Sequence, residues 1–321
     1  MQKASGYAKR GPVFLQKGFC PEYNNMGTVR FKNGFYAALG TPADDSGTLL
    51  RESFAHQIEL MISAGASGLL CMGSMGRMES IRNSDYRFVA EVCASVVRNR
   101  IPLLVGVMDC SIFRVLDRIK TLKGLQIDGV VATPPFYSKV SESEMMNFFN
   151  GIAMNHEYPV YIYDLPSVTQ SPVTLSAIRS LAQNRNIKGI KTANLNLLMD
   201  LERNGISDDD FSVFYSNLDS FDAAVRAGIT KNLDGMFTCT PINSRLMYTG
   251  LTATGSANFS CHLSNILKLR DLFLREAVLA SYSFAMELLG CPGNYHCDYS
   301  PPASGELKEL IFNCMKEIGE I

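Results

Sequence analysis

The feature that most limits the folds open to this chain is a regular alternation of short apolar runs with longer segments of helical period. The runs begin at intervals of 22 to 34 residues and span 35–41, 67–72, 101–107, 129–133, 159–164, 187–192, 211–216 and 233–238. Almost every residue within them is apolar, without alternation between polar and apolar positions. This pattern indicates parallel strands that are covered on both faces.

The segments between the runs carry helix signals. Leu50, Phe54 and Ile58 recur at helical spacing, and Ser141 with Glu144 forms the capping pair that opens many helices. Eight strand–helix units of this size predict a TIM (β/α)8 barrel. An open doubly wound sheet would also alternate, but the chain lacks the phosphate-binding glycine fingerprint of such sheets, which favours closure.

The barrel is predicted to occupy residues 34–255, with flanking segments on both sides. Residues 256–321 contain no strand-like run and are interpreted as a C-terminal helical extension of the same domain. Residues 1–33 are expected to form an N-terminal arm. The arm is rich in lysine and arginine but has no apolar stretch of the kind that a secretory signal needs.

Composition narrows the class of partner. The chain has 321 residues, of which 46% are hydrophobic and 19% charged, and its net charge is −1. This balance argues against nucleic acid and membrane surfaces as partners. The nine cysteines form no C-x-x-C pair, which is typical of free thiols in a reducing cytoplasm. A metal site at Cys291, His296 and Cys297 would need a second ligand pair that the sequence lacks, so we expect no metal.

In such a barrel the reacting groups extend from the carboxyl ends of the strands. Lys191 is the cation at the end of an otherwise apolar run, and desolvation there is expected to lower its pKa and favour the nucleophilic amine. Tyr163 ends the preceding run, 28 residues earlier. Neighbouring parallel strands lie about 4.8 Å apart, so both side chains can face one site. A phenol beside an imine-forming amine can carry protons.

Other strand ends supply candidates for binding. Gly73–Gly76 is a G-S-x-G turn whose amides and Ser74 hydroxyl could hold a carboxylate. Tyr137 belongs to a stiff aromatic segment after the fourth run. Thr41, Asp219 and Cys239 are placed at or near the ends of the first, seventh and eighth runs, where they could contact substrate.

These motifs together resemble the dihydrodipicolinate synthase / N-acetylneuraminate lyase family of class I aldolases, from about residue 34 to about 255. The resemblance is carried by TP (Thr41–Pro42), G-S-x-G (Gly73–Gly76), PPFY (Pro134–Tyr137), YDLP (Tyr163–Pro166) and GIK (Gly189–Lys191). The lysine and tyrosine motifs with their spacing are specific, and the other motifs are supporting.

The resemblance implies that Lys191 forms a Schiff base with pyruvate or another 2-oxo acid while Tyr163 transfers protons. It implies that Ser74 links Tyr163 to Tyr137, which in this family often arrives from a neighbouring subunit. The carboxylate of the oxo acid would bind around Ser74 and Met75. The resemblance also implies a homotetramer and no metal or organic cofactor.

The chain departs from the family pattern at positions that choose the substrate. Met75 stands where a hydroxyl residue is usual, and Arg77 where a glutamate is usual. Val168 replaces the arginine by which the synthase branch holds its aldehyde. The threonine that the sialic acid lyase branch has two residues after the lysine is Ala193 here, and its Asp-Glu pair for sugar hydroxyls is Asp219–Ser220.

We therefore expect a lyase that joins a 2-oxo acid to an aldehyde, or cleaves their aldol, on a sugar-acid-like substrate. Among the possible reactions, we rank cleavage of an N-acetylneuraminate-type substrate first, cleavage of a 2-keto-3-deoxy sugar acid second and the synthase-type condensation third. A dehydratase that uses the same imine is the nearest enzymatic alternative. Two other classes stay open, namely a non-catalytic ligand sensor or scaffold and an unrelated phosphate-binding barrel enzyme.

Overall fold

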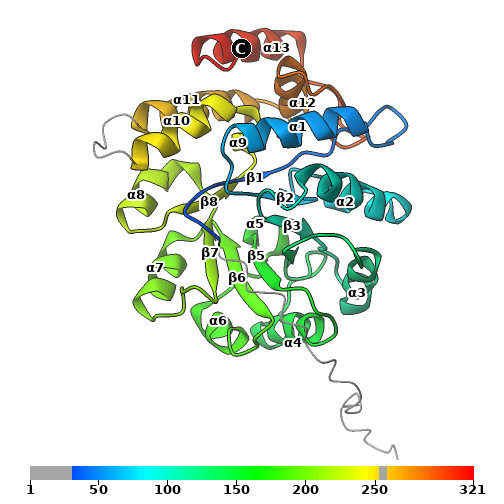
Figure 1. Ribbon diagram of the computed structural model, residues 1–321, viewed down its shortest axis with the longest axis vertical. Coiled ribbons are helices and arrows are strands. Elements are labelled where there is room, and N and C mark those ends of the chain that lie inside the picture. Colours follow the sequence, from blue (N-terminus) through cyan, green and yellow to red (C-terminus); the bar gives the residue numbers. More distant parts are fainter. Residues whose placement is uncertain (1–30, 253–258) are drawn as a thin grey trace, which may run out of the picture.

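The strands of the chain close into a parallel barrel, as the sequence predicts (Figure 1). The computed structural model describes residues 31–252 and 259–321. Within them each strand pairs with the next and β8 pairs with β1. The strands are β1 (Gly34–Ala38), β2 (Gly68–Cys71), β3 (Leu103–Gly106), β4 (Gly129–Ala132), β5 (Val160–Asp164), β6 (Ile187–Thr192), β7 (Ser212–Tyr215) and β8 (Lys231–Asp234).

Helices follow the strands and surround the barrel (Figure 1). They are α1 (Arg51–Ser63), α2 (Asn83–Val97), α3 (Ile112–Thr121), α4 (Glu142–Ala153), α5 (Pro166–Thr169), α6 (Leu175–Leu181), α7 (Leu195–Arg203) and α8 (Phe221–Arg226), with the short 3₁₀ turns η1 (Met78–Ser80) and η2 (Leu218–Ser220). The predicted capping box is confirmed at α4, where Ser141 Oγ accepts from the Glu144 amide and the Glu144 carboxylate accepts from the Ser141 amide. Gly65 follows α1 with a φ of +85°.

Large rings fill the amino end of the barrel. Phe31, Tyr36, Tyr161 and Phe214 are buried, and their neighbouring ring centroids lie 5.0 to 6.2 Å apart. Gly189 makes room for this cluster, since a Cβ there would lie 2.9 Å from the Tyr161 ring and 2.2 Å from a backbone oxygen. The cluster closes one end of the barrel and leaves the carboxyl ends of the strands for chemistry.

The eighth strand differs from its prediction. The expected strand covered 233–238, but β8 ends at Asp234, and the helix α9 (Met236–Cys239) follows it. Local hydrogen bonds account for the change, because the Asp234 carboxylate accepts from the Met236 amide and the Thr238 hydroxyl donates to the Gly235 carbonyl. The prediction followed an apolar run and could not detect these local bonds.

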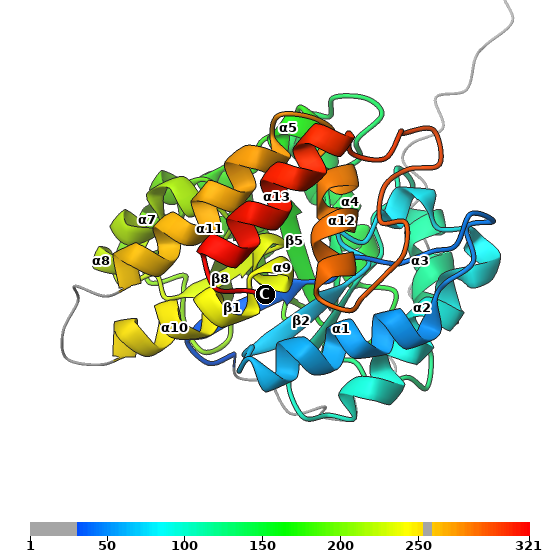
Figure 2. The same ribbon diagram turned by 90° about the horizontal axis from the view of Figure 1, so that it is seen from above.

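The C-terminal helices gather on one side of the barrel, over β1, β2 and β8 in the view from above (Figure 2). They are α10 (Pro241–Thr252), α11 (Phe259–Phe273), α12 (Val278–Leu288) and α13 (Gly305–Glu317). The predicted helical extension is confirmed. Two of its side chains contact segments that follow strands: the Tyr282 hydroxyl lies 2.6 Å from Thr238 Oγ1 in α9, and the Tyr295 ring packs on Gly40 after β1.

Two predictions fall partly outside the described residues. Most of the expected N-terminal arm, residues 1–30, lies outside them, and so does the expected boundary between residues 255 and 256. Among the helices within 31–252 and 259–321, none has both the length and the apolar character to cross a membrane.

Candidate active site

Lys191 and Tyr163 lie side by side at the carboxyl ends of β6 and β5. The two residues are paired in register, which confirms the adjacency predicted from their spacing. Each side chain is only 6% exposed. The Lys191 Nζ lies 3.8 Å from the centroid of the Tyr163 ring. An amine and a phenol are thus held together, shielded from water, at the end of the barrel where such folds carry their active sites.

A buried hydrogen bond fixes these two strands beside the pair. The Asp164 carboxylate accepts from the Thr192 hydroxyl at 2.7 Å and from the Val173 amide at 3.0 Å. Burial raises the pKa of Asp164, and these two hydrogen bonds act in the opposite direction. Asp164 directly follows Tyr163 in the chain, and Thr192 directly follows Lys191. The hydrogen bond between Asp164 and Thr192 therefore sets the relative position of the phenol and the amine.

Ser74 approaches the pair from the loop after β2. Its hydroxyl donates to the Tyr163 hydroxyl across 3.5 Å, a long contact of a kind often seen in enzymes without substrate. The loop folds back on itself, with the Arg77 amide donating to the Ser74 carbonyl at 3.2 Å. Thr41, three residues after the end of β1, is buried, and its Oγ1 has no hydrogen-bond partner among the residues described.

Met75 reaches from the β2 loop to the end of β8. A Cβ built on Gly235 would lie 2.2 Å from the Met75 Cγ and 2.7 Å from its Sδ. The half-buried thioether therefore rests directly on the Gly235 backbone. Where the family resemblance implies a hydroxyl donor, this chain presents apolar surface.

Asp219 follows β7 in η2 and is paired with an arginine from the C-terminal helices. The Arg270 Nη1 lies 2.8 Å from the Asp219 Oδ1, and its Nη2 lies 2.7 Å from the Asp271 Oδ1. Any substrate hydroxyl that approached Asp219 would meet a carboxylate already bound by a guanidinium. Sequence reasoning missed Arg270, because nothing near it in the chain signals a partner some 50 residues earlier.

The true end of β8 carries a carboxylate that sequence reasoning also missed. Burial raises the pKa of Asp234, while the Met236 amide and then the charges of Lys191 and Arg270 act in the opposite direction. Asp234 therefore belongs to the electrostatic surroundings of the lysine. The sequence does show an acidic residue, Asp234, directly before Gly235. Because the eighth strand was expected to end at residue 238, Asp234 was not recognised as its last residue.

Two candidates lie apart from this group. Cys239 is not at a strand end as expected but within α9, where its Sγ lies 3.2 Å from the Met236 carbonyl oxygen and burial raises the pKa of the thiol well above its usual range. Tyr137 is 89% exposed in the loop after β4, and no contact joins it to Ser74 within the described chain. Within residues 31–252 and 259–321, no three His, Cys, Asp or Glu side chains form a group that could hold a metal ion.

Comparisons with known proteins identify the family of the chain. A sequence model of the Dihydrodipicolinate synthetase family matches residues 31–309. A 4-hydroxy-tetrahydrodipicolinate synthase from Gluconacetobacter diazotrophicus is 28% identical over 55% of this chain, and the match spans only 59% of that relative's length. A protein of the same name from Bartonella quintana is 24% identical over 89% of this chain and 98% of its own.

Solved structures share the fold. Dihydrodipicolinate synthase from Thermotoga maritima superposes with a TM-score of 0.83 at 20% identity. The match covers 91% of this chain and 100% of that protein's chain. A prophage protein of the dihydrodipicolinic acid synthase family from E. coli K12, solved with pyruvate, gives a TM-score of 0.81 at 21% identity, covering 89% and 98%. Because the family match extends over most of the sequence, the chain belongs to the dihydrodipicolinate synthetase family of Schiff-base aldolase-type lyases and synthases.

Proposed function

We propose that this protein forms a Schiff base between Lys191 and pyruvate or another 2-oxo acid and makes or breaks a carbon–carbon bond beside it. The observation that carries the proposal is the 3.8 Å contact between the Lys191 amine and the Tyr163 ring. The Ser74 hydroxyl, 3.5 Å from the phenol oxygen, extends the pair into a three-residue group. Imine chemistry needs a nucleophilic amine with a proton carrier next to it.

In the cleavage direction, the neutral Lys191 amine adds to the C2 carbonyl of the substrate, and water leaves to give an iminium. Tyr163 gives its phenol proton to the hydroxyl group that leaves as water, and the phenolate so formed accepts the proton of the C4 hydroxyl. The C3–C4 bond then breaks, its electron pair forms an enamine with the iminium carbon, and an aldehyde departs. Protonation at C3 and hydrolysis release the 2-oxo acid and restore the amine. The iminium nitrogen is the electron sink, so the proposed reaction uses no cofactor.

The carboxylate of the 2-oxo acid would bind the backbone amides around Ser74 and Met75. Amide groups in a tight turn bind anions well. Met75 contributes no hydroxyl to this site, so the amides and the Ser74 hydroxyl would supply the hydrogen bonds. Thr41, with its unpaired buried hydroxyl, is a further candidate contact on this side of the barrel.

For the second substrate we favour a sugar-acid-like aldol, either N-acetylneuraminate-like or a 2-keto-3-deoxy sugar acid. Val168, half exposed on α5, cannot supply the positive charge that holds the aldehyde in the synthase branch. Asp219 with Arg270 offers both an acceptor and a donor for hydroxyl groups. The relatives reported above bear the synthase name, so a synthase-type condensation is the second candidate, followed by a dehydratase.

We further propose that the protein acts as a homotetramer in the cytoplasm. The exposed Tyr137 ring is suited to entering the site of a second copy, where the family resemblance places it beside Ser74. A monomeric dihydrodipicolinate synthase variant shares this fold with a TM-score of 0.84 at 20% identity, covering 92% of this chain and 100% of its own, so the fold alone does not require assembly. The free thiols of the described cysteines suit a reducing compartment.

Reductive trapping tests the proposal. The protein is incubated with pyruvate and borohydride, and the adduct is located by intact mass and peptide mapping. We expect one reduced pyruvate on Lys191 in the wild type and none in Lys191→Ala. Lys188→Ala is the matched control, because Lys188 lies on the same strand but pairs with Asp210 at 3.5 Å. A wild type that traps neither pyruvate nor longer 2-oxo acids would support a sensor or scaffold instead.

A further inference from the structure

The loop that carries Ser74 is bounded by two residues in the left-handed conformation. Met72 has a φ of 55° and Arg77 a φ of 48°, and neither is a glycine. Such backbone is strained and persists only where its surroundings enforce it. Gly76 is one such constraint, since a Cβ there would lie 2.9 Å from the Met72 Cα and 3.1 Å from the Leu39 carbonyl oxygen.

The Arg77 side chain is the other constraint. It is only 9% exposed, and its guanidinium donates to the carbonyls of Thr41, Asn294 and His296. In the described chain no carboxylate lies within ion-pair distance of it, and its Nε has no hydrogen-bond partner. Among the described residues its direct hydrogen-bond partners are carbonyls, while the charges of Glu79 and Asp298 act on it from farther away. Burying a guanidinium in this way is costly.

The carbonyls that receive Arg77 belong to two well-anchored segments. Thr41 follows β1, and Asn294 and His296 lie in the C-terminal connector, which we define as residues 291–297 between α12 and α13. Asn294 exchanges two backbone hydrogen bonds with Ala43, at 2.8 and 3.0 Å. Tyr295 is fully buried, and its hydroxyl donates to the Cys291 carbonyl at 2.9 Å. Arg77 therefore ties a strained loop to rigid neighbours on both sides.

We propose that Arg77 is a positioning residue that holds the Gly73–Gly76 amides in place for the carboxylate of the 2-oxo acid, and that the C-terminal connector sets their geometry through it. This inference rests on the proposed function. A guanidinium is planar and presents several donors at once, so it can bridge three carbonyls where a lysine ammonium on a flexible stem cannot. The C-terminal connector is thereby part of the apparatus that binds the 2-oxo acid, although none of its own residues needs to touch that acid.

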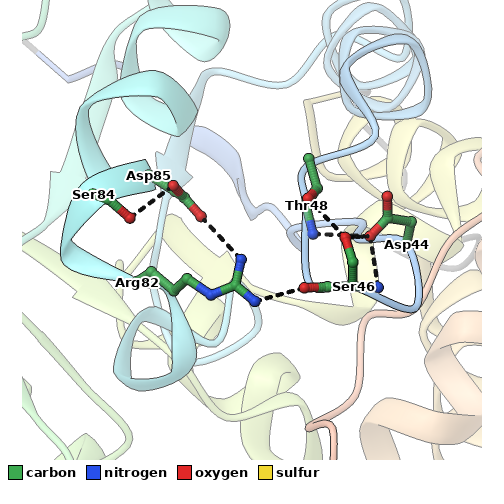
Figure 3. A network of polar contacts seen from close by, with 6 residues as sticks. All are labelled: Asp44, Ser46, Thr48, Arg82, Ser84 and Asp85. Carbon is green, nitrogen blue, oxygen red and sulfur yellow. Dashed lines mark hydrogen bonds and ion pairs between the residues drawn. The ribbon is translucent and has the colours of Figure 1, made fainter.

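A matched control lies in the same region. Arg82 reaches from the start of α2 to the Ser46 carbonyl, 2.6 Å from its Nη2, and pairs with Asp85 at 3.7 Å (Figure 3). It is 59% exposed and contacts the loop after β1 rather than Gly73–Gly76. Arg82→Met therefore removes an arginine that also links two segments, but one that the proposal assigns no part in binding.

The test measures deuterium exchange into the methyl group of pyruvate in heavy water, which needs the imine but no aldehyde. We expect Arg77→Met and Arg77→Lys to raise the half-saturating pyruvate concentration roughly 10- to 100-fold, the range expected for a misplaced binding group, while the maximal rate changes far less. Arg82→Met should behave as wild type. Unchanged half-saturation in folded Arg77→Lys, or a fall in maximal rate alone, would overturn the inference.

Three outcomes separate a failure of this inference from a failure of the variant or of the proposed function. If Arg77→Met does not fold, amide hydrogen exchange on the wild type decides: 73–78 and the C-terminal connector should open as one unit, and independent opening refutes the link. If the wild type neither exchanges nor traps any 2-oxo acid, the proposed function fails and the inference fails with it. Wild-type exchange with unaffected Arg77 variants refutes the inference alone.

Discussion

Tyr163→Phe is the change that most directly tests the chemistry assigned to this site. It removes one oxygen atom and leaves the ring, so the 3.8 Å contact with the Lys191 amine is preserved. The lost hydroxyl has one hydrogen-bond contact within the described chain, at 3.5 Å from Ser74. The variant therefore separates proton transfer by the phenol from packing by its ring.

The two contributions differ in size. A single hydrogen bond of this length contributes less than about 1 kcal/mol to stability, so the melting temperature should barely move. A positioned proton carrier accelerates a reaction about 10²- to 10⁴-fold, which corresponds to roughly 3–5 kcal/mol in the barrier. The reasoning thus expects a large kinetic loss in a protein of almost unchanged stability.

The assay is the same exchange of pyruvate methyl protons in heavy water, followed by NMR. Tyr161→Phe is the matched control, because Tyr161 lies on the same strand and is equally buried, but its ring belongs to the aromatic cluster at the other end of the barrel. Tyr161→Phe should exchange at the wild-type rate. Exchange at that rate by Tyr163→Phe would refute the assignment of Tyr163 as the proton carrier.

Further predictions concern stability and are measured by urea titration. Burial lowers the pKa of His156 to about 4, so the folded chain binds fewer protons than the unfolded chain below about pH 6.5. The free energy of unfolding should therefore be fully retained above that pH and fall by up to about 3 kcal/mol as the pH drops to about 4. In His156→Gln this fall should be smaller. Gly106→Ala would place a Cβ 2.0 Å from the Met72 carbonyl oxygen and should cost about 1–3 kcal/mol or more, whereas Gly305→Ala meets nothing within 4 Å and should cost nothing. Ser141→Ala removes the cap of α4 and should cost about 1 kcal/mol; an unchanged midpoint would contradict the cap's contribution.

The strand order and the central pair of the site were predictable because both depend on local pattern and spacing. Parallel strands covered on both faces are apolar throughout, and a strand-to-strand distance of one repeat places Tyr163 next to Lys191. The eighth strand was predicted less well. Its Lys231 and Asn232 are polar, and the apolar run that follows forms α9 because of side-chain hydrogen bonds to its own backbone.

The sequence by itself determined a closed parallel barrel, a lysine–tyrosine pair at its carboxyl end and the family to which the chain is similar. Only the tertiary structure decided which groups surround that pair. Arg77 binds a carbonyl 219 residues away, and Arg270 binds Asp219 from a C-terminal helix. The physical reason is that periodicity and strand spacing arise from hydrogen bonding and burial between near neighbours in the chain. The contacts of Arg77 and Arg270 arise instead from the packing of distant segments, and the apolar pattern of a helix does not indicate which polar group its charged residues will meet.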